Sequence, residues 1–417
     1  MKILVINAGS SSVKLTLYNT PDNTALASGQ VERIGLDGTR LHYANLRGDN
    51  VNRAITLEDT TAAIGELTSL LVEKRIGVIP STRDISAIGH RVVHGGEKMT
   101  APTLITEPVK KIILDCFKLA PLHNPPNMAG IRACEAHFPG VPQVAVFDTA
   151  FHTTLPDYAY VYGLPYPLYQ EDKIRRYGFH GTSHQYVSQT AAASLNQPLA
   201  AIRLITCHLG NGCSITAVKE GRSIDTSMGF TPLEGLIMGT RCGDLDPAIV
   251  FYLMEHKRLD VEQINQLLNK QSGLLGLAGI GSNDLRDILN AKNEGHQQAE
   301  LAVNAFIYRI KKYIGAYTAA MGGLDVIVFT AGIGENSAEV RHMVCAGLEG
   351  IGIRLDHQKN AAANGKCRQI QHDRSRVKIM VVPTDEERAI AAQTLDVIRS
   401  IRPAEPKPGS PQNGNDS

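Results

Sequence analysis

The most constraining feature of this chain is a polar turn between two apolar segments near its start. Residues 3–6 (ILVI) read as a buried strand, and residues 13–18 read as a second one. The turn between them lies in NAGSSSVK at 7–14, whose glycine, hydroxyls and lysine could hold phosphate oxygens. The candidate phosphate ligands here are Ser10, Ser12 and Lys14. An ordinary β-hairpin with a polar turn is the other interpretation.

Two later segments repeat this pattern. A strand at 203–207 leads through HLGNG at 208–212 into a strand at 213–218, and a strand at 326–329 leads into TAGIGEN at 330–336. We expect the third to be a glycine-rich turn before a helix, at the sheet edge where α/β proteins bind ligands. No GxxxxGK[ST] occurs, and the third segment lacks the last glycine of the dinucleotide fingerprint. The repeat predicts two related halves with a cleft between them.

These segments belong to a longer ordered set of motifs spread over residues 1–400. They are NAGSSSVK at 7–14, HRVVHGG at 90–96, LAPLHNP at 119–125, VAVFDTAFH at 144–152, RRYGFHGTSH at 175–184, HLGNG at 208–212, DTSMGFTPLEGLIMGTRCGDLDP at 225–247, SGLLGLAG at 272–279, FTAGIGEN at 329–336 and PTDEER at 383–388. The set resembles the acetate kinase family, within the group that also contains sugar kinases, actin and heat-shock chaperone ATPases. The resemblance implies a duplicated actin-like, ribonuclease H-like α/β fold with the nucleotide between two lobes.

Composition excludes several other classes of protein. Lysine plus arginine totals 42 against 41 acidic residues, so nothing favours nucleic acid or an anionic membrane. The seven cysteines include no CxxC and indicate a reducing compartment, and Cys207 and Cys213 read as buried apolar residues. A strand that starts at Lys2 leaves no room for a signal peptide, and no apolar run is long enough to cross a bilayer. We expect a cytoplasmic protein.

Short apolar runs alternate with amphipathic stretches along the chain, which is typical of α/β layers. Buried strands are predicted at 3–6, 144–147, 204–207, 326–329 and 377–382, and helices at 61–75, 128–137, 184–195, 261–269, 297–320 and 386–401. We expect an N-terminal lobe over 1–149 and a nucleotide-binding and dimerisation lobe over 150–385. The resemblance implies that helix 386–401 returns to the first lobe, and composition predicts a disordered tail over 402–417.

Two arginines are the candidate cations for phosphoryl transfer, which needs alignment and positive charge more than covalent chemistry. Arg91 precedes a glycine turn and could be an ordinary surface residue. Arg241 could form a structural pair with Asp244 or Asp246. The resemblance implies that Arg91 orients a substrate carboxylate and Arg241 stabilises the moving phosphoryl group.

His180 and Asp148 complete the predicted catalytic set. His180 lies between two glycines and is structural in one interpretation, whereas the resemblance implies contact with the phosphoryl oxygens. Asp148 could cap a helix opening at Thr149. The resemblance places Asp148 in the active site, but a carboxylic acid of pKa about 4 has no proton to remove at neutral pH. We therefore expect Asp148 to position Mg²⁺ through water or to orient an arginine.

The resemblance assigns the metal and nucleotide ligands. Asn7 and Glu386 match the positions for Mg²⁺, with Mn²⁺ as a possible substitute, although a turn role and a helix-start role are open to them. Asp385 departs from the asparagine usual in the family. The nucleotide ligands expected for ATP or ADP are Ser10, Ser12, Lys14, His208, Leu209, Gly210, Asn211, Gly212, Asp284, Leu285, Arg286, Gly332, Ile333, Gly334, Glu335 and Asn336. Asp284 and Arg286 could equally form a local surface pair.

The acyl pocket expected from the resemblance consists of four apolar residues, each of which could be mere core. They are Val93, Leu122, Phe179 and Pro232. Because propionate-preferring relatives tend to have a smaller residue at position 93, valine there favours acetate over propionate.

The expected activity is therefore the reversible phosphorylation of acetate by ATP, giving acetyl phosphate and ADP by direct in-line transfer. The resemblance also implies a homodimer. A propionate or butyrate kinase is the nearest alternative. A nucleotide-switched, actin-like or chaperone-type ATPase is an alternative from another class.

Overall fold

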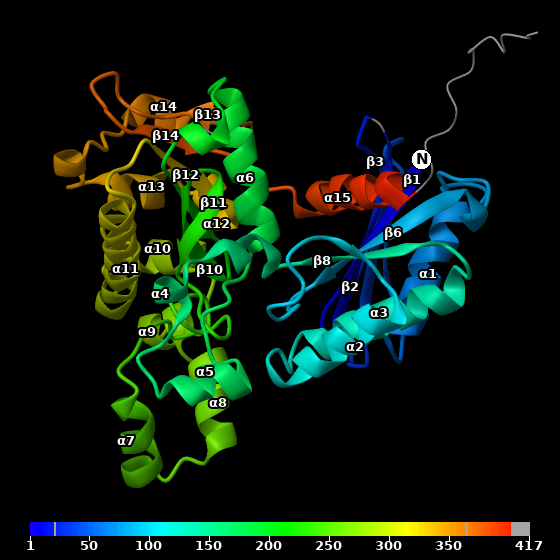
Figure 1. Ribbon diagram of the computed structural model, residues 1–417, viewed down its shortest axis with the longest axis horizontal. Coiled ribbons are helices and arrows are strands. Elements are labelled where there is room, and N and C mark those ends of the chain that lie inside the picture. The colour runs from blue at the N-terminus through cyan, green and yellow to red at the C-terminus, as the bar shows by residue number, and fades with distance from the viewer. Residues whose placement is uncertain (21, 363–365, 402–417) are drawn as a thin grey trace, which may run out of the picture.

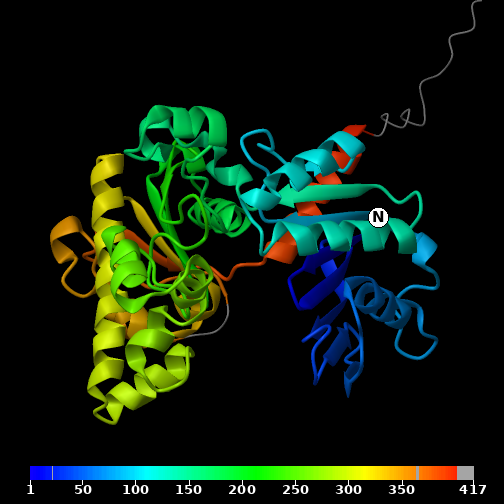
Figure 2. The same cartoon turned by 90° about the horizontal axis from the view of Figure 1, so that it is seen from below.

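The computed structural model describes residues 1–20, 22–362 and 366–401. They form two lobes that lie side by side in both views (Figures 1 and 2). Each lobe is built on one mixed β-sheet covered by helices. The predicted tail over 402–417 lies outside the described residues.

The first lobe has eight strands in the order β5-β4-β3-β2-β1-β6-β8-β7, and the second has six in the order β11-β10-β9-β12-β14-β13. The strands of the first sheet are Lys2–Ala8 (β1), Ser12–Asn19 (β2), Thr24–Glu32 (β3), Arg40–Asn45 (β4), Asn50–Ala54 (β5), Ile85–Val92 (β6), Thr103–Leu104 (β7) and Gln143–Phe147 (β8). Those of the second are Leu204–Leu209 (β9), Cys213–Lys219 (β10), Arg222–Thr226 (β11), Val326–Thr330 (β12), Arg368–Gln369 (β13) and Lys378–Val381 (β14).

The two sheets share a five-stranded core. In the first, β1 pairs antiparallel with β2 and parallel with β6, while β3 flanks β2 and β8 flanks β6. In the second, β9 pairs antiparallel with β10 and parallel with β12, while β11 flanks β10 and β14 flanks β12. Order and direction agree strand by strand, so the predicted duplicated α/β fold is confirmed.

Helices cover both sheets. The first lobe carries Thr60–Val72 (α1), Glu107–Asp115 (α2) and Asn124–His137 (α3). The second carries Asp157–Tyr160 (α4), Tyr166–Asp172 (α5), Gly181–Ser194 (α6), Ala248–Lys257 (α7), Val261–Lys270 (α8), Gly273–Ala278 (α9), Leu285–Asn293 (α10), Gln297–Met321 (α11), Ala331–Asn336 (α12), Ala338–Cys345 (α13) and His357–Ala361 (α14). Short 3₁₀ turns occur at Thr82–Asp84, Cys116–Lys118, Ala150–Thr154, Leu199–Ala201 and Glu349–Ile351.

The last helix, Glu386–Ile401 (α15), crosses back to the first lobe (Figure 1). Its residues Ile390, Leu395 and Ile398 share a buried cluster with Ile3 and Val144 of the first sheet. Burying an aliphatic side chain of this size contributes about 1.5–3 kcal/mol. The chain therefore crosses from the second lobe to the first just before Glu386.

Two local expectations were wrong. The helix predicted from 128 begins at Asn124, because the proline pair falls in its first turn, where a missing N–H costs nothing. The glycine-rich segment expected as a turn before a helix is itself the short helix α12. The buried guanidinium of Arg341 donates to the carbonyls of Gly334 and Glu335 at 2.9 and 2.8 Å, which satisfies the end of that helix.

Two compositional expectations can be compared with the described residues. Cys207 and Cys213 are fully buried, as predicted, and all seven cysteines are free. Within the described ranges, no helix is long and apolar enough to cross a membrane.

Candidate active site

The two predicted phosphate turns occupy the same place in the two sheets. In the first lobe the Gly9 N–H donates to the Ser12 carbonyl at 2.8 Å, and in the second the Gly210 N–H donates to the Gly212 carbonyl at 3.2 Å. Each turn joins the central strand of its sheet, β1 or β9, to the antiparallel neighbour. Ser10 is exposed and Ser12 is half-buried. Both turns thus lie at the ends of the central strands.

Arg91, at the end of β6, holds two carboxylates. Its Nε and Nη2 donate to the two oxygens of Asp148 at 3.2 and 2.6 Å, and its Nε lies 3.8 Å from Glu386. Burial opposes the charge on Arg91, but Asp148 and Glu386 raise its pKa overall. Burial raises the pKa of Asp148, Glu386 adds to the rise, and Arg91 opposes it. Arg91 is partly buried and paired with the buried Asp148, so it is no ordinary surface residue. Among the described residues nothing pairs with Arg91 Nη1.

Arg241 has no carboxylate partner in the described part of the chain. Its Nη1 donates to the Pro232 carbonyl at 2.7 Å, and burial lowers its pKa. Asp244 pairs instead with Arg309 at 3.0 Å, which excludes one structural pair considered for Arg241, and no ion pair joins Arg241 to Asp246. A guanidinium held in this way is a ready partner for an anion.

Two imidazoles stack at the start of the second lobe. The rings of His180 and His208 lie 4.2 Å apart at 24°. Each is anchored through Nδ1, His180 to the Ser214 hydroxyl and His208 to the Ser183 hydroxyl, both at 2.8 Å. Burial lowers the pKa of His208 to about 4 and that of His180 well below its usual value. Both rings are therefore neutral at neutral pH.

Gly212 brings Arg241 and His180 together. A Cβ added at Gly212 would lie 3.1 Å from Arg241 Nη2 and 3.4 Å from His180 Cε1. Arg91 and Arg241 both lower the pKa of His180, so charges from both lobes reach this ring. Arg241 and His180 thus meet at the second turn, and Arg91 is near enough for its charge to act on the His180 ring.

His123 was missed by sequence reasoning. It lies just before α3, and burial, Arg91 and Arg241 lower its pKa while Asp148 raises it. Its ring is therefore within electrostatic reach of the same two guanidiniums. The only signal in the sequence is its place in LAPLHNP, a motif that also supplied Leu122.

Residues 384–387, around the start of α15, bond to both lobes. Glu387 pairs with Lys14 at 2.5 Å and accepts from Thr16 at 2.6 Å, so Lys14 carries a compensated charge. The Thr384 N–H donates to Glu335 at 2.9 Å. Asp385 accepts the Arg388 N–H at 3.0 Å, which caps α15 as an asparagine also would.

A cavity of about 630 Å³ opens in the second lobe beside the second and third glycine segments. It is lined by eight of the predicted nucleotide ligands, namely Gly210, Asn211, Asp284, Leu285, Arg286, Gly332, Ile333 and Asn336. Its other lining residues are Gly239, Leu274, Asn283, Leu289 and Ser337. The Asn283 amide donates to the Asn211 side chain at 2.9 Å and so joins two of its walls. The volume suits a nucleoside phosphate.

The remaining predicted nucleotide ligands lie outside this cavity. His208, Leu209 and Gly212 belong to the second hairpin, and Ser10, Ser12 and Lys14 belong to the first lobe. Gly334 is buried under Arg341, and Glu335 is engaged by Thr384.

Asp284 and Arg286 pair locally at 2.5 Å, and the hydrogen bonds from Arg286 lower the pKa of Asp284 to about 2. The local pair considered from the sequence is therefore present, although both residues line the cavity.

The four predicted acyl-pocket residues differ in burial. Val93 and Phe179 are buried in one apolar cluster, Leu122 is 50% exposed, and Pro232 is half-buried. The Pro232 carbonyl accepts from Arg241, so this residue lies beside one of the two arginines.

The predicted metal ligands offer few oxygens. The Asn7 side chain makes no hydrogen bond within the described ranges, and the Glu386 carboxylate is partly exposed. The same ranges contain no cluster of three or more histidine, cysteine or acidic side chains suited to a metal. Mg²⁺ takes few protein ligands beside phosphate oxygens and water, so this sparse set fits Mg²⁺ better than a metal that needs a protein cage.

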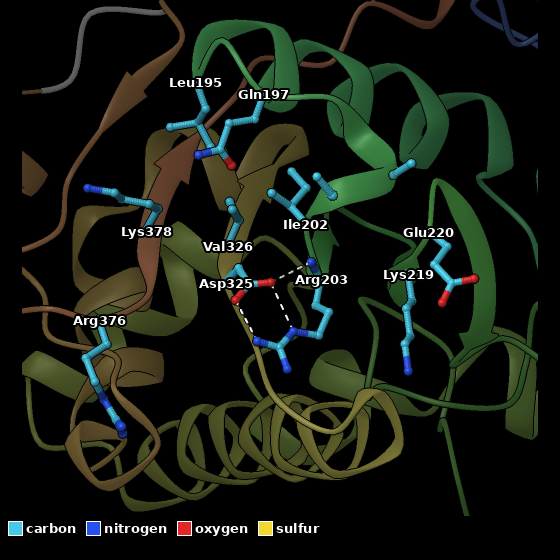
Figure 3. A pocket seen from close by; sticks show the side chains of 12 residues that line it. Leu195, Gln197, Ile202, Arg203, Lys219, Glu220, Asp325, Val326, Arg376 and Lys378 are labelled. Carbon is cyan, nitrogen blue, oxygen red and sulfur yellow. Dashed lines mark hydrogen bonds and ion pairs between the residues drawn. The ribbon is translucent and has the colours of Figure 1, made fainter.

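A second cavity of about 600 Å³ lies at the opposite edge of the second sheet, where β9, β12 and β14 begin. At its centre Arg203 and Asp325 are paired at 2.8 Å (Figure 3). Lys219, Arg376 and Lys378 surround this pair but do not converge on a common point (Figure 3). This cavity is remote from the arginines and histidines of the cleft.

Comparison with known proteins agrees with this geometry. The model of the acetokinase family matches residues 2–392. An acetate kinase of Desulfitobacterium hafniense is 53% identical over 96% of this chain and all of its own length. The crystal structure of Porphyromonas gingivalis acetate kinase superposes with a TM-score of 0.91 at 46% identity, covering 95% of this chain and 99% of the other. A propionate kinase from Francisella tularensis gives 0.89 at 43%, with the same coverage. The chain belongs to the acetokinase family.

Proposed function

We propose that the chain is an acetate kinase that transfers the terminal phosphoryl group of ATP to acetate and runs in both directions. The observation that carries this proposal is the pair of unlike arginines at one site. Among the described residues, Arg91 Nη1 has no partner and Arg241 pairs with no carboxylate. One cation can orient a small carboxylate while the other receives phosphoryl charge.

Acetate is bound by Arg91 in this account. Asp148 accepts from Nε and Nη2, which leaves the third nitrogen, Nη1, to bind acetate. A charge-assisted hydrogen bond from Nη1 would hold one carboxylate oxygen and so orient the attacking group. No base is needed, because acetate is ionised at neutral pH. Asp148 thus acts as the residue that orients Arg91.

The phosphoryl group is stabilised from the second lobe. Arg241 offers Nη2 and Nε, and His180 offers a neutral imidazole across Gly212. Preformed donors of this kind act where charge develops in the transition state. Closure of the lobes would exclude the water that competes with acetate for the phosphoryl group.

ATP is placed with its adenosine in the cavity bounded by Asn211, Asp284 and Gly332, and with its phosphates directed toward the second turn. Asn7 and Glu386 would hold Mg²⁺, with Mn²⁺ as a substitute. The ion, when bound, supplies positive charge to the phosphate oxygens. The fit of these two residues rests on the unpaired side chain of Asn7 within the described ranges and on the partly exposed carboxylate of Glu386, 3.8 Å from Arg91.

The assay that tests this function compares acetate and propionate in both directions. Acyl phosphate is trapped with hydroxylamine in one direction, and ATP formation is followed in the other. We expect a higher kcat/KM for acetate. A higher value for propionate would instead make the chain a propionate kinase, the activity named for the Francisella tularensis relative. ATP hydrolysis indifferent to either acid would favour a nucleotide-switched ATPase.

We also propose a homodimer formed through the second lobe. Helix α7 buries none of its residues within the chain, and Ile249, Phe251 and Tyr252 are exposed on it. Exposed apolar area of this kind is typical of a subunit interface. Light scattering should give twice the mass of the 45.1 kDa chain. The Phe251→Glu variant should instead give the mass of a single chain. The seven free cysteines support a cytoplasmic location.

A further inference from the structure

Three buried side chains stand behind the His180 ring and continue its hydrogen bonds into the protein. His180 Nδ1 is 2.8 Å from Ser214 Oγ, and Ser214 Oγ is 2.7 Å from His184 Nε2. His184 Nδ1 in turn is 2.6 Å from Thr206 Oγ1. Ser214, His184 and Thr206 are each fully buried. Their polar hydrogens must therefore find acceptors within this chain of bonds.

Both imidazoles in the chain are neutral, because burial lowers the pKa of His180 and of His184 well below the usual value. A neutral imidazole has one N–H and one acceptor nitrogen. Ser214 has a single hydroxyl hydrogen to share between the two rings. The hydrogen bonds can therefore run in either of two directions.

In one direction His180 Nδ1 donates to Ser214, Ser214 donates to His184 Nε2, and His184 Nδ1 donates to Thr206. The hydroxyl hydrogen of Thr206 is then left with the Thr216 carbonyl at 3.5 Å, which is too long for a useful bond. In a third arrangement Ser214 accepts from both rings, and its own hydroxyl hydrogen has no acceptor. Each of these arrangements strands a buried hydroxyl.

In the other direction the hydrogens of Thr206, His184 and Ser214 all have short acceptors. Thr206 donates to His184 Nδ1, His184 Nε2 donates to Ser214, and Ser214 donates to His180 Nδ1. His180 then carries its hydrogen on Nε2. Nε2 of His180 has no hydrogen-bond partner among the described residues. It is also not among the buried polar atoms that lack a partner, so this nitrogen is accessible from the surface. Phosphoryl oxygens are acceptors, so a donor is what they require there.

We infer that Ser214, backed by His184 and Thr206, is a positioning residue that holds His180 as the Nε2–H tautomer and aims this donor at the transferring phosphoryl group. The inference rests on the role proposed above for His180. Ser214 touches neither substrate. It acts through the imidazole.

Nitrogen-15 NMR of the wild-type enzyme labelled on histidine tests the tautomer directly. The His180 signals, among those of 14 histidines, are assigned from the spectrum of His180→Gln. We expect a protonated Nε2 and an unprotonated Nδ1 on a neutral ring. A protonated Nδ1, with Nε2 bare or with both nitrogens protonated, would overturn the inference. Because this measurement uses the native protein, it does not depend on a variant that folds.

Kinetics of Ser214→Ala supply the second test. We expect kcat to fall about tenfold, the effect of one lost hydrogen bond on alignment, with KM for acetate little changed. Thr68→Ala is the control, because Thr68 is also buried and its hydroxyl donates to the Ile64 carbonyl at 2.6 Å within α1 of the first lobe. It should lose similar thermal stability but retain kcat. Equal losses of kcat in both variants would mean that Ser214 is merely structural.

A double variant separates this inference from the proposed function. If His180→Gln retains kcat, the proposed role of His180 is wrong and the inference fails with it. If His180→Gln loses activity, Ser214→Ala should cause no further loss in that background, because both act through one group. Additive losses would overturn the positioning role of Ser214 while leaving the role of His180 intact.

Discussion

The two lobes share one strand order but differ in whether the cations at the sheet edge are paired with carboxylates. At the edge of the first sheet, Arg91 is bonded to Asp148 and Lys14 to Glu387. At the equivalent edge of the second sheet, Arg241 has no acidic partner in the part of the chain that the structure describes, and the stacked imidazoles of His180 and His208 are neutral. The first lobe thus presents compensated cations, one of which, Arg91, keeps Nη1 for a small carboxylate. The second presents an uncompensated cation and neutral donors, which suit a phosphoryl group.

Replacing each arginine in turn should give the largest effects on activity, and the effects on stability should distinguish the two lobes. Arg241→Ala should lower kcat by about a thousandfold or more, as the loss of an arginine finger does, and leave the melting temperature almost unchanged. Arg91→Ala should lose comparable activity and also about 3–5 kcal/mol of stability, because buried Asp148 is left without its partner. Urea unfolding and initial rates measure both. Equal stability of the two variants would break the comparison.

Acidification should destabilise the fold through its neutral histidines. Burial lowers the pKa of His152, in the second lobe, to about 4. Below its unfolded pKa of about 6.5 the unfolded chain takes up a proton that the folded chain refuses, so stability falls between pH 6.5 and 4 by about 1.4 kcal/mol per pH unit. Unfolding free energies across this range should show a shallower slope for His152→Gln. An unchanged slope in this variant would remove His152 from the acid response.

Crowding the second turn should disturb the second lobe alone. Gly212→Ala would place a methyl group 3.1 Å from Arg241 Nη2 and 3.4 Å from His180 Cε1, and misplacement of catalytic groups on this scale costs up to about a hundredfold in rate. Gly315→Ala is the matched control, because a Cβ at this exposed helical position meets nothing within 4 Å. Steady-state rates should fall only for the first. Full activity of Gly212→Ala would show that this turn is not part of the active site.

Val93 tests the place where the lobes share an apolar cluster. Val93 follows β6 of the first lobe and packs in one cluster with Phe179 of the second. Shortening it in Val93→Ala should improve propionate relative to acetate by about tenfold, because one methylene in a pocket is worth about 1–3 kcal/mol. The ratio of kcat/KM for the two acids measures this change. An unchanged ratio would assign Val93 to the core alone.

The smallest effect is expected at Asp385. Because its side chain caps α15, Asp385→Asn should preserve the cap and change stability by less than about 0.5 kcal/mol. The Mg²⁺ concentration needed for half-maximal rate should also be unchanged. A large shift in that concentration would bring Asp385 into the metal site and add a charge to the first lobe.

Local patterns were sufficient to predict the duplicated fold. The turns at 7–14 and 208–212 lie next to their flanking strands in the sequence, so each hairpin can be recognised from one short segment. Pairings between distant segments were beyond the same reasoning. Nothing near Lys14 indicates that Glu387 will neutralise it, and the partner of Asp148 depends on the parallel pairing of β6 with β8. The fold of 331–336 as helix depends on a buried arginine that follows it in sequence.

In the proposed mechanism, Arg91 and Arg241 face each other across acetate and the terminal phosphate of ATP. A crystal structure with Mg²⁺, acetate and a non-hydrolysable ATP analogue would test this arrangement. We expect an acetate oxygen on Arg91 Nη1, about 3–3.5 Å from the terminal phosphorus and in line with its leaving oxygen, with Arg241 on the phosphate oxygens. Acetate bound away from Arg91, or too far from the phosphate to react with the lobes closed, would contradict it.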